Sequence, residues 1–150
     1  MIQRIHHLGI KVRDFDKMIE FYKQAFGFEI VGQELDLSFQ LPKDKAQLRP
    51  RVLMMRTGNC FIEIIQNLSL PVFPAMSPSA QGSIAHFSVE VTDIDQEFDR
   101  LKALGMSFET PGPEHYGHVK SVHGRDPEGN DIELLEIVGP WDCDLNALLQ

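Results

Sequence analysis

Residues 5–16 read IHHLGIKVRDFD, and residues 84–95 read IAHFSVEVTDID. The two stretches align without a gap, so that His7 superposes on His86. Each copy is followed by a short apolar segment that holds one acid, FIEII around Glu63 and DIELL around Glu133. A repeat whose halves each supply one imidazole and one carboxylate predicts a four-ligand metal site about a pseudo-two-fold axis.

The composition is that of a globular chain with an acidic balance. Its 150 residues are 43% hydrophobic and 24% charged, which suits one compact domain or two small modules with a shared core. We expect a cytoplasmic protein, since the chain has neither a signal-peptide core nor a run of the ~18 apolar residues of a membrane span. The net charge of -8 disfavours nucleic acid and anionic membranes as partners. Cys60 and Cys143 lack CxxC spacing and are expected to be free thiols.

Each half of the repeat predicts a strand followed by a helix. Residues 4–12 alternate between an apolar face and a face that carries His7, Gly9 and Lys11, as in a β-strand. Asp14 or Asp16 then offers a helix N-cap, and Gly27 a C-terminal stop. The second half repeats this plan, with Asp93 or Asp95 as the cap and Gly105 as the stop.

Further strands complete the same plan in both halves. We expect them at residues 28–35, 51–56 and 60–66, and again at 106–109, 118–125 and 131–137. The predicted fold class is therefore α+β, with two βαβββ modules in a single domain. The module boundaries are about 4–68 and 83–138, with a linker at 69–82 and a tail at 139–150 that forms a short helix after Trp141. The polar, proline-containing stretch from Asp36 to Pro50 is expected to be a surface loop.

The predicted metal ligands are His7, Glu63, His86 and Glu133. His7 is preferred over its neighbour His6, because the repeat matches His7 with a histidine and His6 with an alanine. Taken singly, each histidine is better explained as a hydrogen-bonded, partly buried residue, and each glutamate as an exposed or salt-bridged one. Taken together, the four residues favour a metal site. An unpaired carboxylate between apolar neighbours costs free energy, and a divalent cation removes that cost. The donor set suits Ni, Co, Mn, Fe or Zn in an open, catalytic geometry.

The other histidines carry less information. His115, His118 and His123 lie in or beside the glycine-containing stretch PGPEHYGHVK. They are read as exposed loop residues in preference to substrate contacts. The chain has no GxSxG elbow, no Walker loop and no dinucleotide glycine fingerprint.

Four motifs carry a resemblance to a known family: HHLGIKVRD at His6, FYKQAFGFE at Phe21, IAHFSVEV at Ile84 and DPEGNDIELLE at Asp126. With them the chain resembles the vicinal oxygen chelate superfamily, which includes glyoxalase I, methylmalonyl-CoA epimerase, extradiol dioxygenases and bleomycin-resistance proteins. The resemblance implies paired βαβββ modules that form an open, cup-shaped mixed sheet, and it places the four predicted ligands on the superfamily's metal positions. It further implies a homodimer with a small-molecule substrate.

Within the superfamily, the resemblance points to a metal-dependent lyase or isomerase similar to lactoylglutathione lyase. Such an enzyme chelates vicinal oxygens of its substrate and stabilises an enediolate after Glu133 or Glu63 removes an α-proton. Lys11 and Asn67 match the positions that hold glutathione, although lysine lacks the bidentate fork of arginine. The substrate is then a thiol adduct or an acyl thioester.

Three alternatives stay open at this point. One is an epimerase similar to methylmalonyl-CoA epimerase, although the stretch RVLMMR from Arg51 lacks the acid that those epimerases use as a base. Another is a dioxygenase, whose usual two histidines and one glutamate disagree with an acid at Glu63. The last is a small-molecule binding or resistance protein, with a lining made of Phe39, Met54, Met55 and Phe61.

Overall fold

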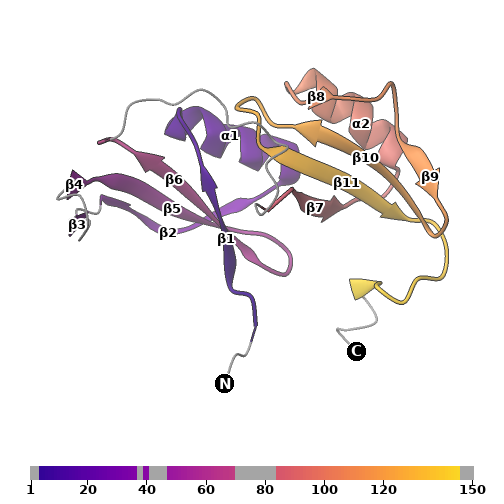
Figure 1. The fold of residues 1–150 in the computed structure, drawn as a ribbon, viewed down its shortest axis with the longest axis horizontal. Helices are drawn as coiled ribbons and strands as arrows, with labels where there is room; N and C mark the ends of the chain where they lie inside the picture. The colour runs from indigo at the N-terminus through magenta and orange to yellow at the C-terminus, as the bar shows by residue number, and fades with distance from the viewer. Residues whose placement is uncertain (1–3, 37–38, 41–46, 70–83, 146–150) are drawn as a thin grey trace. The chain divides into compact units, whose positions relative to one another are not determined.

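The computed structural model describes residues 4–36, 39–40, 47–69 and 84–145 (Figure 1). The chain divides into two compact units, residues 1–74 and 75–150, which we call module 1 and module 2. Each module combines one helix with one mixed β-sheet, so the predicted α+β class is confirmed. The predicted linker falls almost wholly on residues 70–83, outside the described residues.

Module 1 has the expected βαβββ order. Its elements are β1 (His7–Lys11), α1 (Phe15–Phe26), β2 (Glu29–Asp36), β5 (Pro50–Arg56) and β6 (Phe61–Asn67). The sheet order is β1-β6-β5-β2, with β1 parallel to β6 and the other pairs antiparallel. The parallel pair is possible because the chain passes through α1 and two further strands before β6 returns beside β1.

The stretch predicted as a surface loop contains two short strands. These are β3 (Phe39–Gln40) and β4 (Gln47–Leu48), which pair antiparallel as a separate two-stranded sheet. In addition, β2 continues to Asp36. The prediction of a loop was therefore wrong for residues 39–40 and 47–48, because strands of two residues are too short to show an alternating pattern.

The caps of α1 explain where this helix begins and ends. Asp14 adopts an extended conformation, and its Oδ1 accepts a hydrogen bond of 3.2 Å from the backbone N–H of Lys17. At the other end Gly27 takes a φ of 65°, and its N–H donates to the carbonyl of Lys23. Only glycine adopts this left-handed geometry without strain. The buried side of the helix packs on β6 and consists of Phe15, Met18, Phe21, Tyr22 and Ala25.

Module 2 repeats the βαβββ plan, and its sheet has five strands where the main sheet of module 1 has four. Its elements are β7 (Phe87–Glu90), α2 (Ile94–Ala103), β8 (Ser107–Phe108), β9 (Glu114–Tyr116), β10 (Val119–Arg125) and β11 (Asp131–Ile137). The sheet order is β7-β11-β10-β8, and β9 also pairs with β10. As in module 1, the first strand lies parallel to the last, here β7 beside β11.

The N-terminus of α2 is held by two carboxylates. Asp93 is the N-cap, as one of the two predicted caps, and its side chain accepts from the N–H of Gln96. The carboxylate of Glu136 on β11 accepts from the N–H groups of Asp93 and Ile94 at 2.7 and 3.4 Å. The helix is thereby tied to the strand that also carries Glu133, and acidic groups at this end suit the helix dipole.

The turn between β10 and β11 fixes the register of these two strands. Asp126 is 3% exposed, and its Oδ1 accepts from the N–H groups of Glu128 and Asn130 at 2.8 and 2.9 Å. Its Oδ2 accepts from the side-chain amide of Asn130 at 2.8 Å. The turn places Arg125 opposite Asp131, and counting along the strands then places His123 opposite Glu133.

The remaining predictions concern the tail, the membrane and the cysteines. The predicted helix after Trp141 lies mostly outside the described residues, and the described part shows a turn in which the Asp144 N–H donates to the Trp141 carbonyl. Neither helix of the described segments is long and apolar enough to cross a membrane. Both Cys60 and Cys143 are free thiols, as expected.

Candidate metal centre

In module 1, the parallel pairing of β1 and β6 brings His7 beside Glu63. His7 pairs with Phe61 and Gly9 pairs with Glu63, so the acid lies two positions further along the strands than the imidazole. The distance from His7 Nε2 to Glu63 Oε2 is 3.7 Å. Glu63 lies on the sheet face opposite the buried Ile62 and Ile64, so the pair faces away from the helix-packed core.

Module 2 contains the same arrangement. His86 immediately precedes β7, and Glu133 pairs with Ser88, again two positions beyond the histidine. The distance from His86 Nε2 to Glu133 Oε2 is 3.4 Å. Glu133 alternates with Ile132 and Leu134, which are fully buried, so this pair also lies on the face away from the core. The repeat in the sequence is therefore a repeat in geometry.

These distances suit two ligands of one metal ion better than they suit a hydrogen bond. Two donor atoms that are each ~2.1 Å from a metal lie ~3.0 Å apart at a right angle and ~3.4 Å apart at the tetrahedral angle. The 3.4 Å of module 2 equals the tetrahedral value, and the 3.7 Å of module 1 lies ~0.3 Å beyond it. An N···O separation of 3.7 Å is too long for a hydrogen bond.

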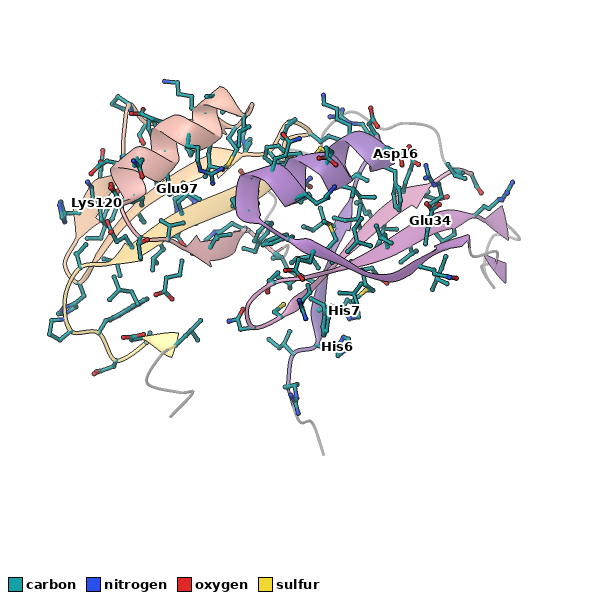
Figure 2. All side chains as sticks on the ribbon, turned by 180° about the vertical axis from the view of Figure 1, so that it is seen from behind. His6, His7, Asp16, Glu34, Glu97 and Lys120 are labelled. Carbon is teal, nitrogen blue, oxygen red and sulfur yellow. The ribbon has the colours of Figure 1, made fainter. Side chains whose placement is uncertain are left out.

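The two carboxylates also lack the lysine or arginine partner that other acids of the described segments have. Glu63 and Glu133 are 27% and 15% exposed, and within the described segments neither has a lysine or arginine within ion-pair distance. By contrast, Arg51 donates to Glu34 and contacts Asp16 at 3.2 Å. These two acids are labelled in Figure 2. The hydrogen bond to Glu34 raises the pKa of the Arg51 guanidinium above its usual range. Glu63 and Glu133 thus fit a divalent cation, which would supply the missing positive charge.

Within each module, however, only a pair of the predicted ligands comes together. Among the residues that the structure describes, no three histidine, cysteine, aspartate or glutamate side chains are placed so that they could hold one metal ion. The structure therefore brings His7 to Glu63 and His86 to Glu133.

His6, which was not predicted as a metal ligand, contacts the side chain of His7. The Nδ1 atoms of the two rings are 3.0 Å apart, and His6 stacks on the ring of Phe61 with centroids 5.1 Å apart (Figure 2). Because the Nε2 atom of His7 faces Glu63, a hydrogen bond at Nδ1 restrains the orientation of the ring; with Nε2 as the metal ligand, the Nδ1–H of His7 would be the donor to His6. Such outer partners commonly orient metal-binding histidines. Module 2 has Ala85 at the equivalent place, so this support exists in module 1 alone.

One site residue was missed: His123. It was expected to be an exposed residue in or beside a loop, although the strand predicted at 118–125 contains it. It is exposed and lies within β10, directly opposite Glu133, and this pairing was not foreseen. Its Nε2 is 3.7 Å from Glu133 Oε1, and its ring centroid is 4.8 Å from that of His86. Counting back from the DPEGN turn would have found it. His115 was likewise misplaced in a loop, since it lies in β9, whereas His118 lies in the exposed turn before β10.

Lys11 and Asn67 lie on the same strands as the module 1 pair. Lys11 ends β1 opposite Ile65 and is exposed, and Asn67 ends β6. The Oδ1 of Asn67 accepts from the N–H of Ser69 at 3.0 Å. Their odd-numbered positions place both residues on the face that carries His7 and Glu63, towards the end of the strands beyond Glu63.

The lining suggested for a binding protein is only partly on this face. Met54 lies opposite Glu63, and Phe61 lies two residues before Glu63 on the same face of β6. Met55 is fully buried in the helix-packed core opposite Ile62, so that assignment was wrong, because adjacent strand residues face opposite sides. The side chain of Phe39 lies outside what the structure describes.

The comparison with family models agrees with this geometry. The model of the Glyoxalase/Bleomycin resistance protein/Dioxygenase superfamily matches residues 4–134. The chain belongs to this superfamily. The resemblance carried by the four sequence motifs is thereby confirmed.

Relatives in the superfamily have several different activities in their names. The lactoylglutathione lyase GLX1 of Arabidopsis thaliana is 24% identical over 135 residues, which are 89% of this chain and 44% of that protein. A probable lactoylglutathione lyase of Vibrio cholerae is 27% identical, with 89% and 90% covered. The human mitochondrial methylmalonyl-CoA epimerase is 25% identical, with 87% and 72% covered. The chain thus spans less than half of the plant enzyme and most of the bacterial one.

Solved structures of superfamily members share the fold. A glyoxalase family protein from Bacillus cereus has a TM-score of 0.74 at 20% identity, covering 93% of this chain and 97% of its own. The fosfomycin resistance protein FosX from Listeria monocytogenes has a TM-score of 0.63 at 19% identity, covering 91% and 94%. These similarities confirm the predicted glyoxalase-like fold.

Proposed function

We propose that the chain is a divalent-metal-dependent lyase or isomerase of the superfamily, and that His7, Glu63, His86 and Glu133 are the ligands of one metal ion. The observation that carries the proposal is the repeated pair of one imidazole and one carboxylate. In both modules the pair has the same register and lies on the sheet face away from the helix-packed core. The ion is Ni, Co, Mn, Fe or Zn. A FosX structure of this fold that holds Mn(II) supports a divalent ion.

The carboxylates are the groups that would move a proton. When bound, the ion supplies Lewis-acid stabilisation of the negative charge that develops on a substrate oxygen. Glu63 and Glu133 are the acids next to that position, and each is half-buried with no arginine or lysine partner in the described segments. A carboxylate in such surroundings takes a proton from carbon α to a carbonyl and returns it to the neighbouring carbon.

We further propose that the substrate is a thiol adduct, with Lys11 and Asn67 as its binding residues. Both lie beyond Glu63 on the same sheet face, where a cation and an amide suit the carboxylate and peptide groups of glutathione. Relatives named lactoylglutathione lyase support this substrate class. An acyl thioester substrate is less favoured, because β5 carries no acid that could act as a second base. The proposal includes a cytoplasmic homodimer.

The test is turnover of the hemithioacetal of methylglyoxal and glutathione. The protein is first stripped with a chelator and then supplied with Ni, Co, Mn, Fe or Zn in turn. We expect isomerisation with at least one of these metals, and its loss in Glu133→Gln. Glu90→Gln is the matched control, because Glu90 is an exposed acid of β7 in the same module. Epimerisation of an acyl-CoA thioester without turnover of the hemithioacetal would overturn the proposed substrate class.

A further inference from the structure

The two modules differ at one position beside their glutamates. In module 2 the residue opposite Glu133 on the antiparallel neighbour strand is His123. In module 1 the residue opposite Glu63 is Met54. A neutral imidazole offers an N–H donor, whereas a thioether has none and is only a weak acceptor. The pseudo-symmetry of the ligands is therefore broken by the partner of one carboxylate.

Each oxygen of Glu133 faces its own imidazole. Oε2 is 3.4 Å from His86 Nε2, and Oε1 is 3.7 Å from His123 Nε2. The two rings lie edge to face, with an angle of 83° between their planes. The contact of 3.7 Å is longer than a hydrogen bond, and closing it by ~0.7 Å would give an ordinary N–H···O bond.

The side chain of His123 is not fixed by close packing. Its side chain is 52% exposed, and it borders a hollow of about 190 Å³ that is also lined by Glu109, Tyr116 and Ser121. A side chain at the edge of such a hollow can rotate without displacing the core. For the same reason, substitutions at this position should leave the fold of module 2 intact.

We propose that His123 is a positioning residue for Glu133. It holds Oε1 towards β10, so that Oε2 is presented beside His86. Glu63, opposite a methionine, has no equivalent partner for its carboxylate in the described part of the chain, so this outer contact belongs to module 2 as the contact of His6 with His7 belongs to module 1. This inference rests on the proposed metal-binding function, and it concerns a residue outside the four ligands.

The test compares Mn(II) affinity, measured by titration of the chelator-treated protein, in four variants. Loss of an outer partner typically weakens metal binding by about 10- to 100-fold. We expect His123→Phe to raise the Kd for Mn(II) by at least about tenfold. His123→Gln keeps an N–H donor and should stay within about threefold of the wild type. Met54→Leu, the equivalent position of module 1, and His115→Gln, an exposed histidine of β9, should change the Kd by less than about twofold.

The outcomes separate this inference from the function on which it rests. If the wild type binds no Mn(II) or other divalent ion, the proposed function fails and the inference with it. If the wild type binds but His123→Phe has an unchanged Kd, only the inference fails. Equal weakening in the Phe and Gln variants also contradicts it, since the donor would then be irrelevant. Thermal unfolding of each variant confirms that it is folded.

Discussion

His86 and Glu133 approach within 3.4 Å because His86 immediately precedes β7, which pairs parallel with the strand β11 that carries Glu133. The pair at His7 and Glu63 has the same origin. In both modules the first and last strands of the βαβββ unit are adjacent, so residues far apart in the sequence meet on one sheet face. The site therefore depends on whatever fixes strand register, and in module 2 this is the packing of β10 and the turn at Asp126.

Gly124→Ala should destabilise module 2. A Cβ atom at this position would lie 2.7 Å from the ring of Phe108 and 2.9 Å from the backbone oxygen of Ser107. Because a backbone atom cannot move aside cheaply, β8 must shift away from β10. We expect a loss of about 1–3 kcal/mol in the free energy of unfolding, the usual range for overpacking. Urea denaturation measures it. Gly58→Ala is the control, since a Cβ there meets nothing within 4 Å, and equal stability of the two variants would contradict the argument.

Asp126→Ala should loosen the turn that sets the register of Glu133. The buried carboxylate accepts three hydrogen bonds from Glu128 and Asn130, and its removal leaves their N–H groups without acceptors. We expect a loss on the order of 3 kcal/mol, since hydrogen bonds to charged groups are the stronger kind. Asp126→Asn keeps one oxygen for the two backbone donors and should lose less. Thermal unfolding ranks the variants, and an Asn variant as unstable as the Ala variant would show that these bonds contribute little.

Lys11→Ala should raise the KM for the glutathione hemithioacetal by roughly tenfold, which is the effect of losing one charge-assisted contact. The kcat should change little, because the lysine is placed away from the reacting carbon. Lys11→Arg should lower the KM, since the guanidinium fork binds a carboxylate with two hydrogen bonds. Lys17→Ala on α1 is the control for removing an exposed lysine. A fall in kcat with unchanged KM would place Lys11 elsewhere in the mechanism.

A mixing experiment shows whether the four ligands come from one chain or from two. His7→Ala and His86→Ala each remove one ligand from one module, and each variant alone should be inactive. If a site combines module 1 of one chain with module 2 of another, a heterodimer of the two variants contains one intact site. Co-expression should then restore activity, measured as hemithioacetal turnover, in the mixed dimers alone. If each chain closes its own site, the mixture should stay as inactive as the separate variants.

The parts of the fold with a regular pattern could be predicted from the sequence. The alternation around His7 and the apolar spacing between Asp14 and Gly27 follow the strand and helix periods, and the structure has β1 and α1 there. The repeat then carried both predictions to module 2. The short strands β3, β4 and β9 were missed, because two or three residues are too few to show a period. Their pairing depends on neighbouring strands, which a local pattern does not contain.

The errors at the site have a different origin. The positions of His123 and Met55 were predicted from their residue types and their neighbours in the sequence. The face of the strand on which each side chain lies was not considered. Met55 follows Met54, which lies opposite Glu63. Its side chain therefore points to the other side of the sheet and is buried in the core. Arg125 and Asp131 are the first pair beside the DPEGN turn, and His123 lies two residues before Arg125, so it falls opposite Glu133. Counting the paired residues of two antiparallel strands outward from their turn would have placed both side chains correctly.

The central claim is that two imidazole–carboxylate pairs bind one metal ion, and elemental analysis of the purified protein tests it most directly. We predict about one equivalent of divalent metal per chain in the wild type, as a four-ligand site requires. Glu63→Gln and Glu133→Gln should each lose most of that metal, whereas Glu90→Gln should retain it. Absence of metal from the wild type after supplementation with each candidate ion, or full retention in both ligand variants, would contradict the account.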